Sequence, residues 1–316
     1  MKLNHRAESI IDLLLENADT YRIQVHQQEA GARIVDFGIN TPGGIQAGVK
    51  LAEICLADLA QVQCLPASAE RVSAWQVSVQ TDFPIASCLA SQYAGWKVQV
   101  EDFFAMASGP MRAVYAGDPL FEDEAVKKFK ESSSSVVGVL EADTLPNQAV
   151  LEEIIAKIQS SSPMITLAVA PVTSTAGAIQ VVARSVETAL HKLHELKFDL
   201  KSVVSAAGSA PLPPVGGKMI TALGRTNDAI LYGGDVVLWV DCPIETIKEV
   251  GPKVPSNASN DFGRPFQDIF ERYQFDFYKI DPLLFSPAKI TFIHLPTGKM
   301  LSYGEIATDV LQRSFH

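Results

Sequence analysis

The sequence predicts an α+β protein, in which helices and strands are mixed without a repeating order. Apolar runs of strand length, such as Met164 to Ala170, and alternating runs, such as Trp75 to Gln80, are separated by helical patterns. The regular strand–helix alternation of a doubly wound sheet is missing. The chain has 316 residues, more than one core usually organises, so we expect two α+β domains, 1–165 and 166–316, with an approximate boundary that elements are free to cross.

Composition and charge exclude several classes of protein. Hydrophobic residues make up 47% of the chain and charged residues 20%, as in an ordinary globular protein. The net charge of −10 and the lack of a basic run argue against a nucleic-acid partner. No apolar window reaches transmembrane length, so no membrane partner is expected either. Glu8, Asp12 and Glu16 interrupt the N-terminal apolar run, which therefore predicts an amphipathic helix and not a signal peptide.

The spacing of the four cysteines favours a reducing compartment. Cys55, Cys64, Cys88 and Cys242 show no C-x-x-C spacing, and nothing in the sequence marks a secreted protein. Mostly buried thiols in a reducing cytoplasm are therefore expected.

The first half of the chain is expected to combine a hairpin with helices and further strands. The glycines of the loop over 38–50 allow close backbone approach, either to another element or to a ligand. In order, the sequence predicts a first helix, hairpin strands over 21–28 and 32–37 around Gly31, a helix ending near Leu56, a strand over 75–80, a buried helix over 85–96 and a strand over 97–100.

A turn in the sequence ASGP, residues 107–110, is a candidate ligand site. Its backbone amides, with Arg112 close behind, suit an oxyanion or a carboxylate. A purely structural turn is the alternative interpretation. The polar segment 117–135 that follows is expected to be an exposed connection or the edge of a domain.

The second half contains the stretch around which the chain is organised. The predicted elements are a strand over 136–140, a helix over 147–160, a strand over 164–170, a helix from Gly177 to about residue 196, an irregular Pro- and Gly-rich segment over 208–218 that is neither helix nor central strand, strands over 229–231 and 236–240 around Gly233-Gly234, a short helix within 257–274, and a final hairpin turning at Thr297-Gly298.

A polar stripe is expected on the helix that begins near Gly177. Arg184, Glu187, His191 and His194 follow one another at intervals of three, four and three residues, so a continuous helix places them on one face. Such a stripe is compatible with lining a cavity. A surface ion pair, and histidines favoured by the dipole at a helix C-terminus, are the structural alternatives. The spacing is not that of a His-Glu-x-x-His zinc site.

Four longer stretches resemble segments of methenyltetrahydromethanopterin cyclohydrolase, in that family's order. QYAGW (92–96) and PTGK (296–299) are also similar, and the resemblance runs over essentially the whole chain. The four stretches are FFAMASGPMRAV (103–114), APVTSTAGAIQVVARSVETALHK (170–192), GRTNDAILYGG (224–234) and DFYKIDPLLFSPA (276–288).

The resemblance implies an enzyme of one-carbon metabolism. Such an enzyme reversibly hydrolyses N5,N10-methenyl-tetrahydromethanopterin to the N5-formyl compound, and in methylotrophic bacteria it serves formaldehyde oxidation to formate. The resemblance also implies a cytoplasmic homotrimer with no permanently bound cofactor and no metal. Each subunit would have two α+β domains enclosing a large pocket. Residues 92–96 resemble the bacterial form of the family, because archaeal members usually carry lysine where this chain has Tyr93.

The resemblance also assigns expected roles to residues. Glu187 would be the catalytic carboxylate, taking a proton from water and returning it to N10, and Arg184 would orient it. His191 and His194 are left as structural polar residues. The expected substrate-binding residues are Tyr93, Ser108, Gly109, Arg112, Asn227, Asp228 and Lys279. A turn, a helix cap or a surface charge is the structural alternative for the last six, and Tyr93 is expected near the pocket, where a neutral hydroxyl replaces the positive charge of a lysine.

Two other functions compete with the cyclohydrolase. One is a non-catalytic pterin-binding protein, in which Arg184 and Glu187 are only an ion pair. The other is a metal-dependent amidohydrolase that uses Glu187, His191 and His194 as ligands.

Overall fold

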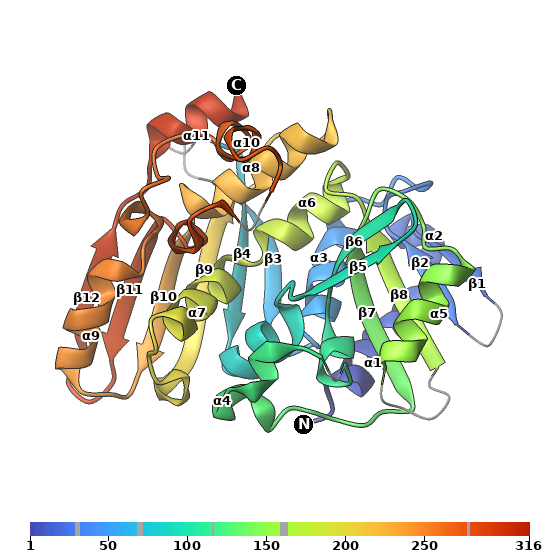
Figure 1. The fold of residues 1–316 in the computed structure, drawn as a ribbon, viewed down its shortest axis with the longest axis horizontal. Coiled ribbons are helices and arrows are strands. Elements are labelled where there is room, and N and C mark those ends of the chain that lie inside the picture. The colour runs from blue at the N-terminus through green and yellow to red at the C-terminus, as the bar shows by residue number, and fades with distance from the viewer. Residues whose placement is uncertain (29–31, 68–71, 116, 159–163, 277–278) are drawn as a thin grey trace. The chain divides into compact units, whose positions relative to one another are not determined.

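The computed structural model describes residues 1–28, 32–67, 72–115, 117–158, 164–276 and 279–316. They form two compact units, each built on one mixed six-stranded sheet with helices, as the α+β class predicts (Figure 1). Unit 1 comprises Met1–Gln61 and Ile85–Gln180, and unit 2 comprises Val62–Pro84 and Val181–His316.

The division differs from the single boundary expected after residue 165. That position lies inside β8 (Met164–Ala170), a strand with neighbours on both sides in the sheet of unit 1. The segment 62–84 belongs to unit 2 because β4 (Trp75–Thr81) pairs with β9 (Val203–Pro211), far along the chain. Such long-range pairing leaves no local mark on the sequence.

The sheet of unit 1 has the strand order β1-β2-β8-β7-β6-β5. Its three central strands β2, β8 and β7 are parallel and the outer pairs are antiparallel. In chain order the elements are α1 (Leu3–Leu15), α2 (Ala18–Tyr21), β1 (Gln24–Gln27), β2 (Arg33–Asp36), α3 (Ile45–Cys55), the π-helix η2 (Ile85–Gln92), β5 (Trp96–Val100), β6 (Phe103–Ser108), η3 (Pro110–Ala113), η4 (Pro119–Glu122), α4 (Glu124–Lys127), β7 (Ser135–Glu141), α5 (Gln148–Lys157), β8, and α6 (Thr175–Val182), which ends in unit 2.

The parallel strands β7 and β8 are buried on both faces, which explains their continuous apolar runs. One face packs against α5 in a core that includes Val136, Leu140 and Leu167. The other packs against α1 and α3 in a core that includes Val137 and Ala168. Alternate residues of each strand therefore stabilise opposite cores.

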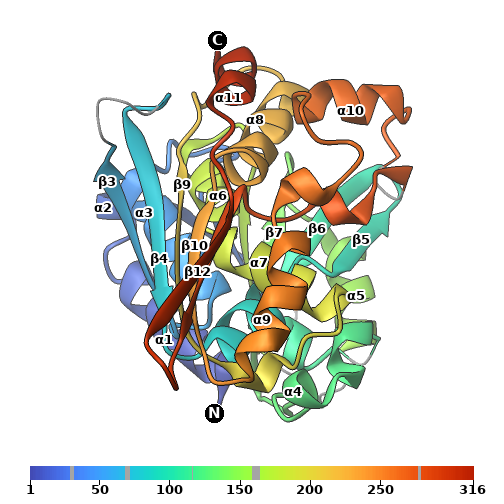
Figure 2. The same ribbon diagram turned by 90° about the vertical axis from the view of Figure 1, so that its left-hand side faces the viewer.

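The sheet of unit 2 has the strand order β12-β11-β10-β9-β4-β3, and β10 and β11 are a parallel pair. Figure 2 views this unit with the edge strand β12 toward the reader. In chain order the elements are β3 (Gln61–Pro66, which starts at the last residue of unit 1), β4, α7 (Ser185–Glu195), η5 (Leu200–Ser202), β9, α8 (Met219–Leu231), β10 (Asp235–Val240), α9 (Ile244–Val250), η6 (Gly251–Lys253), η7 (Ser256–Ala258), α10 (Phe266–Arg272), η9 (Pro282–Leu284), β11 (Lys289–His294), β12 (Lys299–Gly304) and α11 (Thr308–Phe315).

Most of the predicted elements are confirmed, but the predictions for residues 229–231 and 117–135 are wrong. Residues 229–231 end helix α8 and do not form a strand, because Ala229, Ile230 and Leu231 belong to the buried face of a helix that starts at Met219. The segment 117–135 is not simply an exposed connection, because its short helices η4 and α4 bury residues such as Phe121 and Val126. It is not the edge of a domain either, because it lies inside the continuous range 85–180 of unit 1.

Another wrong prediction concerns residues 208–211, which belong to β9, a strand paired on both sides. The sheet accepts glycine here because a Cβ on Gly208 would lie 2.7 Å from Ser185 Oγ and 2.9 Å from Val186 Cγ2. Gly208 thus lets the first turn of α7 pack directly on the strand.

Candidate active site

The predicted catalytic pair lies at the start of α7 in unit 2. The expected continuous helix is interrupted, since α6 ends at Val182 and α7 begins at Ser185, with Arg184 as its N-cap residue. Glu187 is in the first turn. Arg184 Nη1 lies 3.9 Å from Glu187 Oε2, and the two residues are 7% and 4% exposed.

Two positive features lie near the carboxylate of Glu187. The first turn of a helix leaves backbone N–H groups without intrahelical partners, and the helix dipole stabilises negative charge there. The guanidinium of Arg184 adds a positive charge at 3.9 Å. A buried carboxylate between a helix N-terminus and a guanidinium is suited to accept a proton from water.

The two histidines of the predicted stripe lie on α7 with Glu187. Their ring centroids are 6.4 Å apart, and His191 Nε2 lies 3.9 Å from Glu195 Oε1. Within the described residues, no three His, Cys, Asp or Glu side chains are grouped to hold a metal ion, so Glu187, His191 and His194 do not form a ligand set.

Lys192, also on α7, was not singled out by the sequence. Its Nζ donates a hydrogen bond to the carbonyl of Leu283, and the residue is 1% exposed. Burial lowers the pKa of Lys192 to about 8, and the nearby Asp281 partly opposes this shift. The contact ties α7 to the segment that follows Lys279.

Asn227 and Asp228 are neighbours on α8 with different surroundings. Asn227 is partly exposed, and its Nδ2 donates to Leu223 O at 2.9 Å. Asp228 is fully buried, and its two oxygens accept from Phe266 N at 2.8 Å and from Ser314 Oγ at 2.6 Å. Burial raises the pKa of Asp228 to about 7, although both hydrogen bonds act in the opposite direction.

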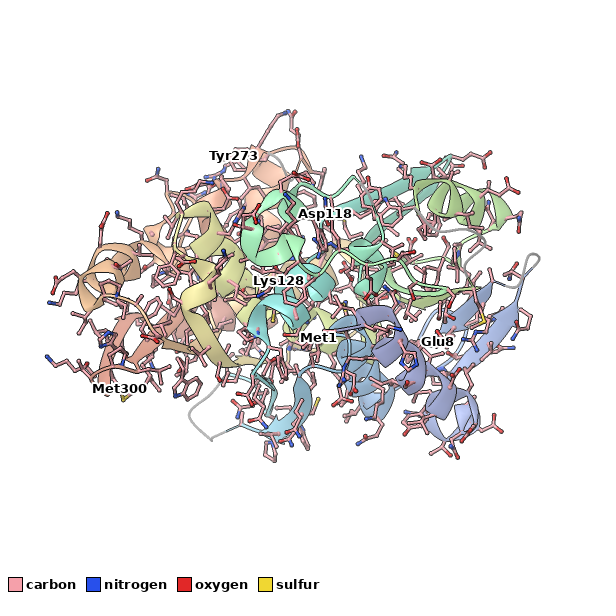
Figure 3. All side chains as sticks on the ribbon, turned by 90° about the horizontal axis from the view of Figure 1, so that it is seen from below. Met1, Glu8, Asp118, Lys128, Tyr273 and Met300 are labelled. Atoms are coloured by element: carbon pink, nitrogen blue, oxygen red, sulfur yellow. The ribbon has the colours of Figure 1, made fainter. Side chains whose placement is uncertain are left out.

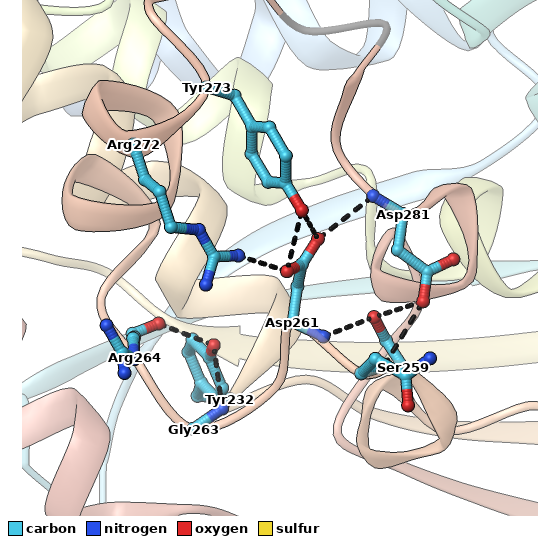
Figure 4. A network of polar contacts seen from close by, with 9 residues as sticks. Tyr232, Ser259, Asp261, Gly263, Arg264, Arg272, Tyr273 and Asp281 are labelled. Atoms are coloured by element: carbon cyan, nitrogen blue, oxygen red, sulfur yellow. Dashed lines mark hydrogen bonds and ion pairs between the residues drawn. The ribbon is translucent and has the colours of Figure 1, made fainter.

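A polar network fixes the segment that carries Lys279 (Figure 4). The carboxylate of Asp261 accepts hydrogen bonds from Arg272, from the hydroxyl of Tyr273 at 3.1 Å and from the backbone N–H of Asp281 at 3.0 Å. Asp281 in turn accepts from Ser259 Oγ at 2.7 Å. Lys279 is exposed, and its Nζ lies 3.4 Å from Asp276 Oδ2.

In unit 1, Tyr93 and Arg112 are brought together. Tyr93 follows the π-helix η2 directly and is half-buried. The Cζ atom of Arg112 lies 4.9 Å from the centroid of its ring, a cation–π distance. Arg112 itself is fully buried, and its Nε donates to Asp118 Oδ2 at 2.6 Å.

Ser108 and Gly109 form the predicted turn between β6 and η3, and both are buried. Ser108 Oγ lies 3.3 Å from Cys55 Sγ, and Gly109 N donates to Ser91 O at 2.9 Å. Gly109 has φ 87° and ψ −179°, a conformation that residues with a side chain rarely adopt. The hydrogen bond from Gly109 to Ser91 therefore ties the turn to the end of η2.

Asp118 is another buried charged residue to which the sequence assigned no role. It precedes Pro119, and an acidic residue directly before proline is typical of a helix N-cap followed by proline at the first helical position. That signal predicts the cap, which the hydrogen bond from Leu120 N to Asp118 Oδ1 at 3.0 Å forms. It does not predict the contact with Arg112.

Comparison with known proteins gives one consistent family. A family model described as Cyclohydrolase (MCH) matches residues 2–315. The chain is 50% identical over 288 residues to the methenyltetrahydromethanopterin cyclohydrolase of Rhodopirellula baltica, which covers 90% of this chain and 86% of the relative. The enzyme of the same name from Xanthobacter autotrophicus is 43% identical over 97% of this chain and 90% of its own. That of Methanocorpusculum labreanum is 41% identical over 100% and 99%.

No helix in the described ranges is both long and apolar enough to cross a membrane.

Proposed function

The chain belongs to the methenyltetrahydromethanopterin cyclohydrolase family, and from this premise we infer that Glu187 and Arg184 carry out its reaction. The enzyme is a hydrolase that acts on a C–N bond of a cyclic amidine. It converts N5,N10-methenyl-tetrahydromethanopterin reversibly to the N5-formyl compound.

The bridging carbon of the substrate lies between two nitrogens that share a positive charge, so it is already electrophilic. Water adds there once a base removes a proton, which gives a neutral carbinol. The C–N10 bond then breaks, N10 takes the proton held by the base, and the carbinol hydroxyl loses its proton to become the formyl carbonyl. One proton is released to solvent in the forward direction, so the atoms and the charge balance.

Glu187 is the base in this proposal. Glu187 is buried in the first turn of α7, a site of low dielectric constant. There it would take a proton from the attacking water and return it to N10. Arg184, at the N-cap, orients that carboxylate from 3.9 Å. The single observation that carries the proposal is this buried pair in a chain that matches the family model over residues 2–315.

Substrate binding is assigned to residues of both units. Tyr93, Ser108 and Gly109 are proposed contacts in unit 1, supported by their clustering around the end of η2. Asn227, Asp228 and Lys279 are proposed contacts in unit 2. The contribution of Asp228 to substrate binding is less direct, because both its carboxylate oxygens already accept hydrogen bonds from Phe266 and Ser314.

The proposal extends to the compartment, the oligomeric state and the metabolic role of the enzyme. We propose a cytoplasmic homotrimer that acts in the oxidation of formaldehyde to formate in methylotrophic growth. The pterin carrier is its substrate, and no cofactor or metal is permanently bound. No nucleic acid or membrane is a partner.

The test is the hydrolysis of methenyl-tetrahydromethanopterin, followed by the loss of the methenyl absorbance. Wild-type protein should consume the substrate, and Glu187→Gln at matched concentration should do so at least about a hundredfold more slowly. Glu195→Gln is the matched control, since Glu195 lies on the same helix with its side chain 47% exposed. A pterin-binding protein would instead bind the substrate without consuming it.

A further inference from the structure

The end of the π-helix η2 is held by side chains and backbone from a different segment. Arg112 Nη1 donates to Leu89 O at 2.7 Å and reaches Ser91 O at 3.4 Å. The N–H of Gly109 donates to Ser91 O at 2.9 Å. π-Helices are rare and are frequently found at functional sites. These contacts satisfy carbonyl groups that the last turn of η2 would otherwise leave open.

The guanidinium that makes these contacts is neutralised by Asp118. Besides the bond from Nε, Arg112 Nη2 lies 2.5 Å from Asp118 Oδ2, and the side chains are 0% and 1% exposed. Asp118 Oδ1 is fixed independently by the N–H of Leu120. A buried charge is tolerated only when it is paired and hydrogen-bonded, so removing Asp118 would release Arg112 from its position.

The ring of Tyr93 packs against this pair. Arg112 Cζ lies 4.9 Å from its centroid. Gly95 follows Tyr93 by two residues, and a Cβ added to it would lie 2.6 Å from Tyr93 Cε1 and 3.4 Å from Asp118 Oδ2. Gly95 therefore leaves the space in which the ring lies beside the carboxylate. The ring of Phe121 packs on the same guanidinium, with its centroid 5.7 Å from Arg112 Cζ.

We propose that Asp118 and Arg112 are positioning residues, which hold the ring of Tyr93 in the orientation that binds the substrate. The inference rests on the proposed function, because that function makes Tyr93 a substrate contact. The role expected of Arg112 thereby becomes indirect: its charge serves Tyr93 and the end of η2, and it does not touch the pterin. Asp118 is a residue to which the sequence assigned no role.

The test is Asp118→Asn, which keeps the shape of the side chain and removes its charge. With methenyl-tetrahydromethanopterin, KM should rise about tenfold while kcat stays within about threefold, because binding is impaired and the base is untouched. In a Tyr93→Leu background, which itself raises KM about tenfold, adding Asp118→Asn should change KM less than about twofold. Residues that act through one another are not additive.

Glu8→Gln is the matched control. Glu8 pairs with Arg33 in the same unit, also largely buried, and Figure 3 shows it on α1, away from Asp118. This variant should lower the melting temperature and change KM less than about twofold in either background.

Several outcomes would overturn the inference. One is an unchanged KM in folded Asp118→Asn, and another is the same KM increase with and without Tyr93. If Asp118→Asn does not fold, the double variant Arg112→Met/Asp118→Leu replaces the pair with apolar groups. A wild-type KM in that folded variant would equally refute the proposal. An active enzyme whose KM is unaffected by Tyr93→Leu would refute this inference alone, whereas an inactive wild type would refute the proposed function as well.

Discussion

Glu187 Oε2 and Arg184 Nη1 are 3.9 Å apart, across the junction between the N-cap and the first turn of α7. This separation is longer than a direct hydrogen bond between the two atoms. At this separation the guanidinium of Arg184 acts on that oxygen through its charge. Arg184 is the N-cap residue of α7 and Glu187 lies in its first turn, so their separation depends on where α7 begins.

Removing the base should abolish most of the rate. We expect Glu187→Gln to lower kcat about a hundred- to ten-thousandfold with KM little changed, the scale of general-base catalysis. Arg184→Ala should also lose rate, because the carboxylate remains but is misplaced. Since the two act as one unit, the double variant should be far less impaired than the product of the single losses. Steady-state kinetics on the four proteins checks this, and multiplicative losses would show independent action.

Tyr93 should contribute through its ring more than through its hydroxyl. We expect Tyr93→Phe to lose less than about tenfold in kcat/KM, roughly one neutral hydrogen bond. The ring that packs on Arg112 is retained in this variant. A loss of roughly a thousandfold would instead identify Tyr93 as a catalytic acid or base.

Activity should not depend on a metal ion. The methenyl bridge already carries positive charge, so a Lewis acid would add little at the reacting carbon. We expect full activity after dialysis against a chelator and no stoichiometric metal in elemental analysis. Activity that is lost in chelator and restored by zinc would contradict this prediction.

The buried carboxyl of Asp228 should make stability depend on pH. Burial raises its pKa from 3.8 to about 7 in the folded protein. Between these values the folded state keeps a proton that the unfolded state has released, so this group's contribution to stability is full below pH 3.8 and is lost as the pH rises to about 7.

Asp228→Asn cannot ionise and should remove this dependence. Relative to the variant, the free energy of unfolding of the wild type should fall with a slope of at most about 1.4 kcal/mol per pH unit across that window. Urea unfolding of both proteins between pH 4 and 8 measures it. Glu305→Gln, which removes an exposed acidic group that does not shift the pKa of Asp228, should give a curve parallel to the wild type. A parallel curve for Asp228→Asn would disprove the prediction.

Gly109 should resist substitution for two reasons. Its φ of 87° is unfavourable for a residue with a side chain, and an added Cβ would lie 3.2 Å from Val139 N. We expect Gly109→Ala to lower the free energy of unfolding by about 1–3 kcal/mol. Gly216, with φ 104° and nothing within 4 Å of an added Cβ, is the matched control and should lose less. Equal losses at both positions would mean that the contact with β7 is unimportant.

Much of the fold could be predicted from local patterns. The hairpin of β1 and β2, the strands β7 and β8, helix α5 and the C-terminal hairpin lie close to where the sequence places them, because periodicity and turn residues are local properties. The residues that carry the family resemblance include Arg184 and Glu187, so the candidate pair and the reaction could also be predicted from the sequence.

Only the tertiary structure decided how these elements are shared and joined. Gly208 looks like a strand breaker in the sequence, yet β9 needs it, because α7 packs where a side chain would stand. The break between α6 and α7 turns a stripe on one helix into a cap and a first turn. Arg112 and Asp118 meet as a buried pair because the chain folds η3 and η4 over the end of η2, and a buried charge takes its partner from the packing around it.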